Sequence, residues 1–296
     1  MRRLIINADD FGLTRGVNRA VAELHQAGFL TSATLMAHAP ATGNAVEIAR
    51  ATPSLGVGCH VVLLDGDPVS PPRDLPHLVH PRTGHLRSSL VDFLLWLYGP
   101  ASRSASLAQI ASEIEAEAAA QIALLQSKGV RLTHIDTHKH VHMFPAILRP
   151  VLRAARAAGI RIVRNPFEPA WSLHATTHTP LLRRAQVSLL RRLQPAFRRI
   201  VAEEGFATTD GAIGVLATGN LDAATVASLL GQLPHGTWEL VAHPGYNDAD
   251  LARVRTRLRA SRDTERLALQ QLGKFSQIEL VSFATAFAPS AHPPTS

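Results

Sequence analysis

Eight short apolar runs with the character of β-strands alternate with helical segments along this chain. In the helical segments apolar residues recur every three to four positions, as in residues 14–26, which Gly28 follows. Strands that alternate with helices predict a parallel α/β fold, and eight strands fit a closed or nearly closed (β/α) barrel. The eight predicted strands are residues 3–7, 31–36, 57–64, 132–136, 160–164, 212–217, 238–242 and 278–282.

An open, doubly wound sheet is the alternative fold. No Gly-x-Gly-x-x-Gly loop follows a predicted strand, which disfavours a dinucleotide-binding sheet. We therefore expect a single barrel domain over residues 1–287, with two insertions at about 65–104 and 167–205 and a disordered tail at 288–296. Insertions of this size usually decorate the active-site face, so we expect them there.

Composition excludes several protein classes. With 46% hydrophobic and 18% charged residues, the chain is not disordered as a whole. It has no run of about 18 uninterrupted apolar residues, so no membrane-spanning helix is expected. The apolar run at residues 4–6 is too short for a signal peptide. The single cysteine, Cys59, allows neither an intramolecular disulfide nor a cysteine zinc cluster, and we expect a cytoplasmic protein.

The chain is basic, with 30 Lys and Arg against 23 Asp and Glu. Such a surface suits nucleic acid or anionic lipid, or simply follows from a genome that favours arginine codons. Aromatic residues make up only 5% of the chain and no nucleic-acid-binding motif is present. We therefore expect no nucleic-acid partner.

Chemically active side chains stand where the predicted strands end or within them. In a parallel α/β fold the carboxyl ends of the strands share one face, so these residues are expected to converge. Histidines and carboxylates that converge in one mouth suit a divalent metal ion. The residues are Asp9 and Asp10 after strand one, His60 in strand three, Asp136 and His138 at strand four, Arg164 after strand five and His243 after strand seven.

Each residue also has a simpler interpretation. The Asp-Asp pair is often a turn or a helix cap, His60 suits a packed core, His243 a turn and Arg164 the surface. The strongest signal is the run from residue 134 to 142, which holds four histidines in nine residues, because so many histidines rarely serve packing alone.

Four motifs resemble the YdjC-like (ChbG-type) carbohydrate deacetylase family, and they span residues 5–245 in the family's order. The family's fold is a distorted, TIM-like (β/α) barrel, and the resemblance implies the same fold here. Within the family, the chain is most similar to the branch associated with hopanoid biosynthesis. That branch implies hydrolysis of the N-acetyl group of an N-acetylglucosaminyl hopanoid. The motifs are Asn7-Ala8-Asp9-Asp10-Phe11-Gly12, Gly58-Cys59-His60, the run from His134 to Pro145, and Ala242-His243-Pro244.

The resemblance also implies roles for individual residues. Asp10, His60 and His138 would hold one divalent metal ion. Asp9 would be the general base and His243 the general acid, and Arg164 would orient the base. Two histidines and one carboxylate suit Zn²⁺, Co²⁺, Ni²⁺ or Mn²⁺. Mg²⁺, which is often named for the family, prefers oxygen ligands. Asp136, His140 and His142 are expected to orient these groups rather than to bind the metal.

Other functions stay open from the sequence. The substrate could be a soluble chito-oligosaccharide instead of a glycolipid, or the enzyme could be a phosphoesterase, whose sites often hold two metals and more carboxylates. Residues 181–200 carry arginine pairs opposite an apolar stripe and resemble an interfacial helix, and the apolar run 90–98 could line a lipid groove. One interpretation of these segments is peripheral contact with the anionic inner face of a membrane. The alternative is that both segments pack on the barrel.

Overall fold

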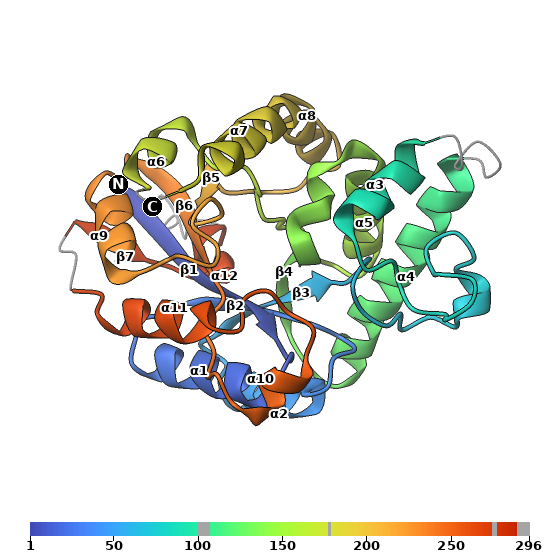
Figure 1. Cartoon of the computed structure of the whole chain (residues 1–296), viewed down its shortest axis with the longest axis horizontal. Helices are drawn as coiled ribbons and strands as arrows, with labels where there is room; N and C mark the ends of the chain where they lie inside the picture. Colours follow the sequence, from blue (N-terminus) through green and yellow to red (C-terminus); the bar gives the residue numbers. More distant parts are fainter. Residues whose placement is uncertain (100–106, 177–178, 274–276, 289–296) are drawn as a thin grey trace, which may run out of the picture.

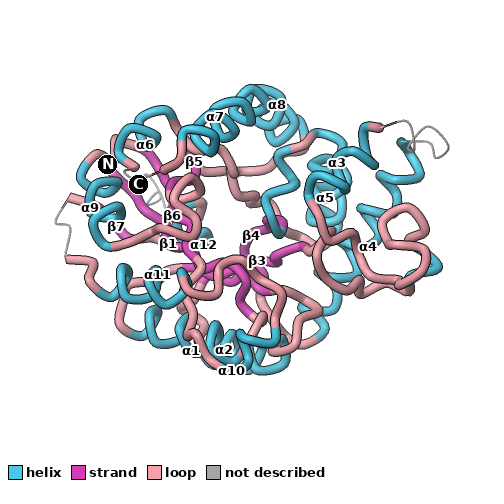
Figure 2. The backbone as a smooth tube through the Cα atoms, in the orientation of Figure 1, coloured by secondary structure: helices cyan, strands magenta, loops and turns pink. Residues whose placement is uncertain are grey.

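The computed structural model describes residues 1–99, 107–176, 179–273 and 277–288. Parallel strands lie near the centre and helices surround them (Figures 1 and 2). Six strands follow the order β4-β3-β2-β1-β6-β5, and β7 pairs with β1. The strands are β1 (Arg2–Phe11), β2 (Ser32–Leu35), β3 (Gly56–Val61), β4 (Leu132–Thr137), β5 (Gly211–Ile213), β6 (Gly236–Ala242) and β7 (Ile278–Leu280).

Helices and short 3₁₀ turns fill most of the connections. The helices are α1 (Arg15–Gln26), α2 (Thr42–Ala51), α3 (Leu90–Tyr98), α4 (Leu107–Ser127), α5 (Pro145–Ala157), α6 (Ala170–Ala175), α7 (Leu181–Leu190), α8 (Gln194–Glu203), α9 (Ala223–Gly231), α10 (Ala249–Arg253), α11 (Ser261–Gln270) and α12 (Phe283–Ala286). The 3₁₀ turns are η1 (Pro72–Asp74), η3 (His138–Met143) and η4 (Arg191–Leu193). Among the described residues, no helix is both long enough and apolar enough to cross a bilayer.

Strand β1 organises the sheet. Along one edge it pairs with β6, from Arg2 opposite Gly236 to Ala8 opposite Ala242. Its other edge pairs first with β7 and then, from Asn7 onward, with β2. The two faces of β1 differ, because successive side chains of a strand point to opposite sides. One face packs into the main apolar core under the helices, and the other carries Asn7 and Asp9 toward the functional residues.

The predicted strand at residues 160–164 does not form as a continuous strand. This segment makes only isolated pairings, of Val163 with Ile135 in β4 and of Ile162 with Ala207. Pro166 follows closely and has no N–H to continue a ladder. The sheet is therefore a curled half-barrel of parallel strands, and the segment lies between β4 and the chain that leads into β5. Strand β5 is also shorter than predicted and ends at Ile213, before Gly214, whose φ is +87°.

Both predicted insertions contact loops that follow strands. The first contains η1 and α3, and its Asp65 binds Lys139 of η3 at 2.6 Å, directly after β4. The second contains α6 to α8; on α7, Arg183 donates to the carbonyls of residues 215 and 216, which follow β5. Both insertions thus border the carboxyl ends of the strands. Residues 100–104, 177–178 and 289–296, which belong to the predicted insertions and tail, lie outside the described residues.

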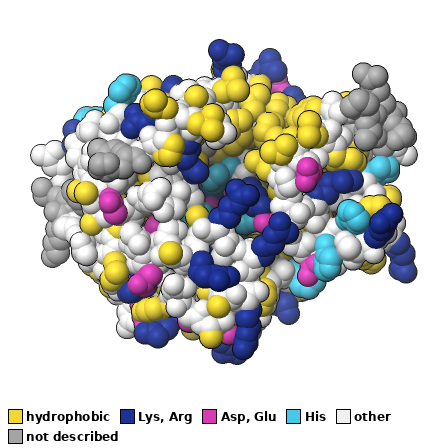
Figure 3. All heavy atoms as spheres, in the orientation of Figure 1, with side chains coloured by type: hydrophobic (Ala, Val, Ile, Leu, Met, Phe, Trp, Pro, Cys, Tyr) yellow, Lys and Arg dark blue, Asp and Glu magenta, His cyan; other side chains and the backbone are white. Residues whose placement is uncertain are grey.

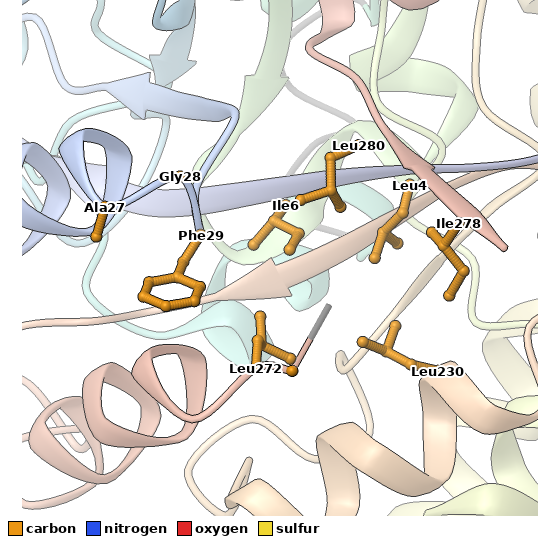
Figure 4. Close-up of a pocket in the computed structure, with 10 residues that line it drawn as sticks. Leu4, Ile6, Ala27, Gly28, Phe29, Leu230, Leu272, Ile278 and Leu280 are labelled. Atoms are coloured by element: carbon orange, nitrogen blue, oxygen red, sulfur yellow. The ribbon is translucent and has the colours of Figure 1, made fainter. Parts of the chain in front are cut away.

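An apolar pocket of about 550 Å³ lies elsewhere, between β1, β7, helix α9 and the residues that follow α1 and α11 (Figure 4). Its lining includes Leu4, Ile6, Phe29, Leu230 and Leu272. It begins at the opposite end of β1 from Asp9 and Asp10, so it is separate from the site described next.

Candidate metal centre and catalytic site

The carboxyl ends of β1, β3, β4 and β6, together with Arg164 from the segment after α5, bring all six predicted site residues together. Figure 3 shows histidine side chains in a hollow near the middle of the molecule, beside basic side chains and a hydrophobic region. Of the six site residues, five are buried, and His138 is about one-fifth exposed. The six are Asp9, Asp10, His60, His138, Arg164 and His243.

Three side-chain atoms of this group form a nearly equilateral triangle. Oδ1 of Asp10 lies 3.5 Å from Nε2 of His60 and 3.3 Å from Nδ1 of His138, and the two histidine nitrogens are 3.3 Å apart. Oδ1 of Asp10 is buried and accepts no hydrogen bond. Two ligands held about 2.0–2.1 Å from one ion at the tetrahedral angle lie about 3.3 Å apart. The three residues therefore fit a divalent metal ion.

Asp136 orients His60 for this role. Oδ1 of Asp136 lies 2.7 Å from Nδ1 of His60, so Nδ1 is bound to this carboxylate and Nε2 faces the triangle, where a metal ion could replace its proton. Burial alone would lower the pKa of His60, but Asp136, Asp10 and Asp9 outweigh burial and raise the pKa to about 10. The same acidic surroundings favour a metal cation at Nε2.

Asp9, next to Asp10 in the chain, is held away from the triangle. Its two oxygens accept hydrogen bonds from Arg164 at 2.6 and 2.8 Å, and Oδ1 also accepts from Asn7 and Thr34. Burial opposes ionisation, but Arg164, His60 and His243 outweigh it and hold the pKa of Asp9 well below its usual range. Asp9 is therefore an ionised hydrogen-bond acceptor at the edge of the metal centre.

Arg164 is wholly buried, so the surface interpretation of this residue is wrong. It contacts Asp136 and Asp9 and donates to Glu239 from Nε and Nη2 at 2.8 and 2.6 Å. Burial raises the pKa of Glu239 to about 7 although Arg164 opposes the shift. Asp9, His60 and Asp136 form a second group of potential metal ligands. In that group the Arg164 guanidinium occupies the place that a second cation would need.

His243 lies between two carboxylates. Nε2 is 3.8 Å from Oδ2 of Asp9, and Nδ1 is 3.6 Å from Oε2 of Glu265. Glu265 also accepts a hydrogen bond from the backbone N–H of His243 at 2.6 Å, which fixes the residue at the end of β6. Burial lowers the pKa of His243, but Glu265, Asp9 and Asp10 outweigh it and the pKa is raised. His243 can therefore carry a proton into the site.

The four histidines of the run 134–142 separate in the fold. His138 alone joins the triangle, because left-handed φ angles at Lys139 and His140 turn the chain sharply after it. His134 is buried below the site and stacks on Phe283, with ring centres 3.8 Å apart. His142 is held by Thr137 at 2.8 Å and lies 3.2 Å from the Arg164 carbonyl, so it supports the strand end.

The sequence analysis did not identify three charged residues of the site. Arg262 donates to Oδ2 of Asp10 at 2.5 Å, Glu239 binds Arg164 and Glu265 binds His243. Arg262 and Glu265 share the buried face of α11 with Ala268 and Leu269. Charged residues at the apolar positions of an amphipathic helix were the signal that could have revealed them.

The chain is similar to several proteins that carry a deacetylase name. "Carbohydrate deacetylase" of Thermoanaerobacter pseudethanolicus is 28% identical over 269 residues, which cover 91% of each chain. "Carbohydrate deacetylase" of Brevibacillus brevis is 42% identical over 52% of this chain, and "Chitooligosaccharide deacetylase" of Salmonella schwarzengrund is 37% identical over 54%. These two matches span only 55% and 58% of the relatives' own lengths.

A solved structure supports the fold. The crystal structure of an Enterococcus faecalis V583 protein assigned to cellobiose-phosphate cleavage superimposes with a TM-score of 0.71 at 24% identity. The alignment covers 96% of this chain and 98% of the other. The model of the family described as YdjC-like protein matches residues 3–275, from the first residues of β1 to beyond α11. This chain therefore belongs to the YdjC-like protein family.

Proposed function

We propose that the protein is a metal-dependent carbohydrate deacetylase that hydrolyses the N-acetyl group of an N-acetylglucosamine-type sugar. The observation that carries the proposal is the position of Asp9 and His243 beside the triangle of Asp10, His60 and His138. The site thus combines three metal ligands, one ionised acceptor and one proton carrier. The names of the relatives from Thermoanaerobacter and Salmonella support this class of reaction.

The reaction adds water to the amide carbonyl carbon and then breaks the C–N bond, giving acetate and a free amine. A divalent cation bound by Asp10, His60 and His138 would supply Lewis acidity, which polarises the carbonyl and lowers the pKa of water. Asp9 is proposed to accept the proton of the attacking water, and Arg164 orients its carboxylate. A low pKa makes Asp9 a weak base, which suffices for a water that is already acidified.

His243 completes the reaction as the general acid. The departing nitrogen must be protonated, because an amide anion is a very poor leaving group. The carboxylates of Glu265 and Asp9 on either side favour the protonated imidazole, and Nε2 faces the site. Glu265 binds the backbone N–H of His243 and lies 3.6 Å from Nδ1 of its ring, so the same residue both fixes the strand end and favours the charged imidazole.

A phosphoesterase with two metals is disfavoured by Arg164. Asp9 and Asp136 would have to bind the second ion, and both already bind the buried guanidinium of Arg164. Within the described residues this leaves one metal position. We expect one Zn²⁺ or Co²⁺ per chain, since octahedral Mg²⁺ at about 2.0–2.1 Å would bring its ligands to about 2.9 Å from one another. The triangle is wider, with sides of 3.3–3.5 Å.

We further propose a glycosylated lipid of the hopanoid type as the substrate, because both insertions expose large apolar side chains near the site. Figure 3 shows hydrophobic side chains gathered over the region of α3, α5, α7 and α8. Contiguous apolar surface of this kind often marks a membrane or lipid contact. We call the following exposed residues of the two insertions the apolar rim: Val91, Leu95, Tyr98, Leu181, Leu182 and Leu189.

The arginines next to the rim divide into two groups. Arg183 and Arg184 hydrogen-bond to backbone carbonyls, including that of Thr176, so they anchor α7 on the protein. Arg192, in η4, is exposed. We propose that α7 presents Leu181 and Leu182 to an anionic bilayer surface while exposed arginines face the lipid headgroups.

The test is a mass-spectrometric assay of the metal-loaded protein on an N-acetylglucosaminyl hopanoid and on a chito-oligosaccharide. Loss of one acetyl group from the lipid substrate supports the full proposal, and loss from the oligosaccharide alone leaves the deacetylase but refutes the lipid substrate. Loss from neither substrate by protein with bound metal refutes the proposed reaction. Replacing Leu181 and Leu182 by Ser should slow the reaction on the lipid and not on the sugar. Leu267→Ser, on exposed α11 surface, is the matched control.

A further inference from the structure

Asp10 uses its two carboxylate oxygens for different partners. Oδ1 faces the two histidine nitrogens of the triangle and accepts no hydrogen bond. Oδ2 accepts a hydrogen bond from Nη2 of Arg262 at 2.5 Å. One oxygen is therefore free for a metal ion and the other is already bound to a cation.

Arg262 has little reason to be buried except this contact. Its side chain is about 1% exposed, and neither Nε nor Nη1 has a hydrogen-bond partner among the described residues. A buried guanidinium with so few partners is unfavourable, and an apolar side chain of similar volume would usually stabilise the fold more. The ion pair with Asp10 is the compensation that the structure shows.

The backbone around Arg262 fixes its position. The N–H of Gly245, which follows His243 and Pro244, donates to the Arg262 carbonyl at 3.1 Å. A Cβ at Gly245 would lie 3.2 Å from Cδ of Arg262, so the loop after β6 packs directly on the arginine side chain. Glu265, one turn further along α11, holds His243. Helix α11 therefore positions both a metal ligand and the proposed acid.

The backbone of Asp10 also has an unusual conformation. Its φ is +62°, in the left-handed region that is costly for a residue with a Cβ. A carboxylate in this position could rotate to offer both oxygens to a metal ion. The hydrogen bond from Arg262 to Oδ2 opposes that rotation.

We propose that Arg262 is a positioning residue that limits Asp10 to one metal-binding oxygen and, by its charge, keeps the bound ion electron-poor. This inference rests on the proposed metal centre. A neutral residue at position 262 would let Asp10 bind through both oxygens and would remove a cation close to the ion. Metal binding should then tighten while catalysis weakens, which is the opposite of the pattern expected for a residue that only supports the fold.

The test compares wild-type protein with Arg262→Met and Arg262→Lys after loading with Co²⁺. In Arg262→Met we expect Co²⁺ to bind more tightly by titration and its visible absorption to weaken, because intensity falls as the coordination number rises. We expect kcat to fall by about 10–100-fold, the usual range for residues that orient metal ligands. Arg262→Lys keeps a charged donor and should recover part of the wild-type spectrum and kcat.

The matched control is Arg266→Met, one turn along the same helix, where the arginine pairs with Asp263 away from the triangle. It should change neither the spectrum nor the affinity. If Arg262→Met does not fold, as judged by circular dichroism, Arg262→Gln takes its place with the same expectations.

The outcomes separate the two proposals. Wild-type protein that binds no Co²⁺ refutes the metal centre and, with it, this inference. Wild-type protein that binds Co²⁺ while the neutral variants keep its spectrum and affinity refutes the inference alone. Weaker Co²⁺ binding together with a lower melting temperature in the neutral variants also refutes it, because Arg262 would then serve only the fold.

Discussion

Asp9 and Arg164 form a bidentate ion pair in the interior of the half-barrel, with both Asp9 oxygens bound at 2.6 and 2.8 Å. The neighbouring Asp10 is bound by a different buried arginine, Arg262. Two carboxylates that are adjacent in sequence therefore have separate partners and face different atoms. This separation is the physical basis for assigning them different roles.

The first prediction concerns Asp9. Asp9→Asn should retain the metal, because the three triangle residues are untouched, and should lose about 10²–10⁴-fold in turnover, the usual contribution of a general base. Metal content by mass spectrometry and deacetylation rate, measured on the same preparation, check both halves. An Asp9→Asn enzyme with near wild-type turnover would rule out Asp9 as the base.

A second prediction separates metal binding from chemistry. His138→Ala removes one corner of the triangle, so the variant should bind metal far more weakly and lose activity with it. The control is His174→Ala on α6, an exposed histidine whose ring bonds the carbonyl of Ala170 in its own helix at 3.1 Å. If His138→Ala keeps a full complement of tightly bound metal, the ligand set is wrong.

The third prediction is loss of stability in mild acid. Burial lowers the pKa of His134 to about 3, against about 6.5 in an unfolded chain. Between these values the unfolded state binds the proton and the folded state does not, so stability is full above about pH 6.5 and falls as the pH drops toward 3. The slope from this residue is about 1.4 kcal/mol per pH unit.

Urea unfolding at several pH values measures that slope. His134→Gln does not titrate, so its stability should depend less on pH by about that amount. His174→Gln, at an exposed position, should keep the wild-type slope. Equal slopes for all three proteins would show that His134 is not held neutral by the fold.

A fourth prediction contrasts a buried arginine with an exposed one. Arg164→Gln leaves Asp9, Asp136 and Glu239 without their shared cation, which should cost about 3–5 kcal/mol of unfolding free energy. Arg149→Gln breaks half-exposed pairs with Glu203 and Glu204 and should cost about 1 kcal/mol or less. Chemical denaturation gives both values, and similar losses would contradict the burial argument.

Much of the candidate site followed from the sequence because it lies at strand ends. Asp10, His60 and His138 were predicted to converge since parallel strands present their carboxyl ends on one face, and the structure brings them together. The predicted helix 14–26 is confirmed as α1, where Thr14 caps the helix by accepting from the N–H of Val17. These features depend on local pattern and on a general rule of topology.

The errors arose where a local pattern had to be decided by distant contacts. Residues 160–164 have the composition of a strand, but only isolated pairings form there. The four histidines of the run 134–142 look equivalent in sequence, and the turn at Lys139 and His140 sends them to different places. No local sequence pattern indicates which histidine next to a turn will face the metal site.

The sequence by itself determined the parallel α/β architecture and the residues that stand at the carboxyl ends of its strands, because hydrophobic periodicity and strand order act over short stretches of chain. Only the tertiary structure decided which charged groups would be buried against them. Arg262 is more than 250 residues away from Asp10 in the chain, and Glu265 is about 20 residues away from His243. Their burial is compensated only by partners that the folded chain supplies, and a charged residue on a helix carries no local sign of such a partner.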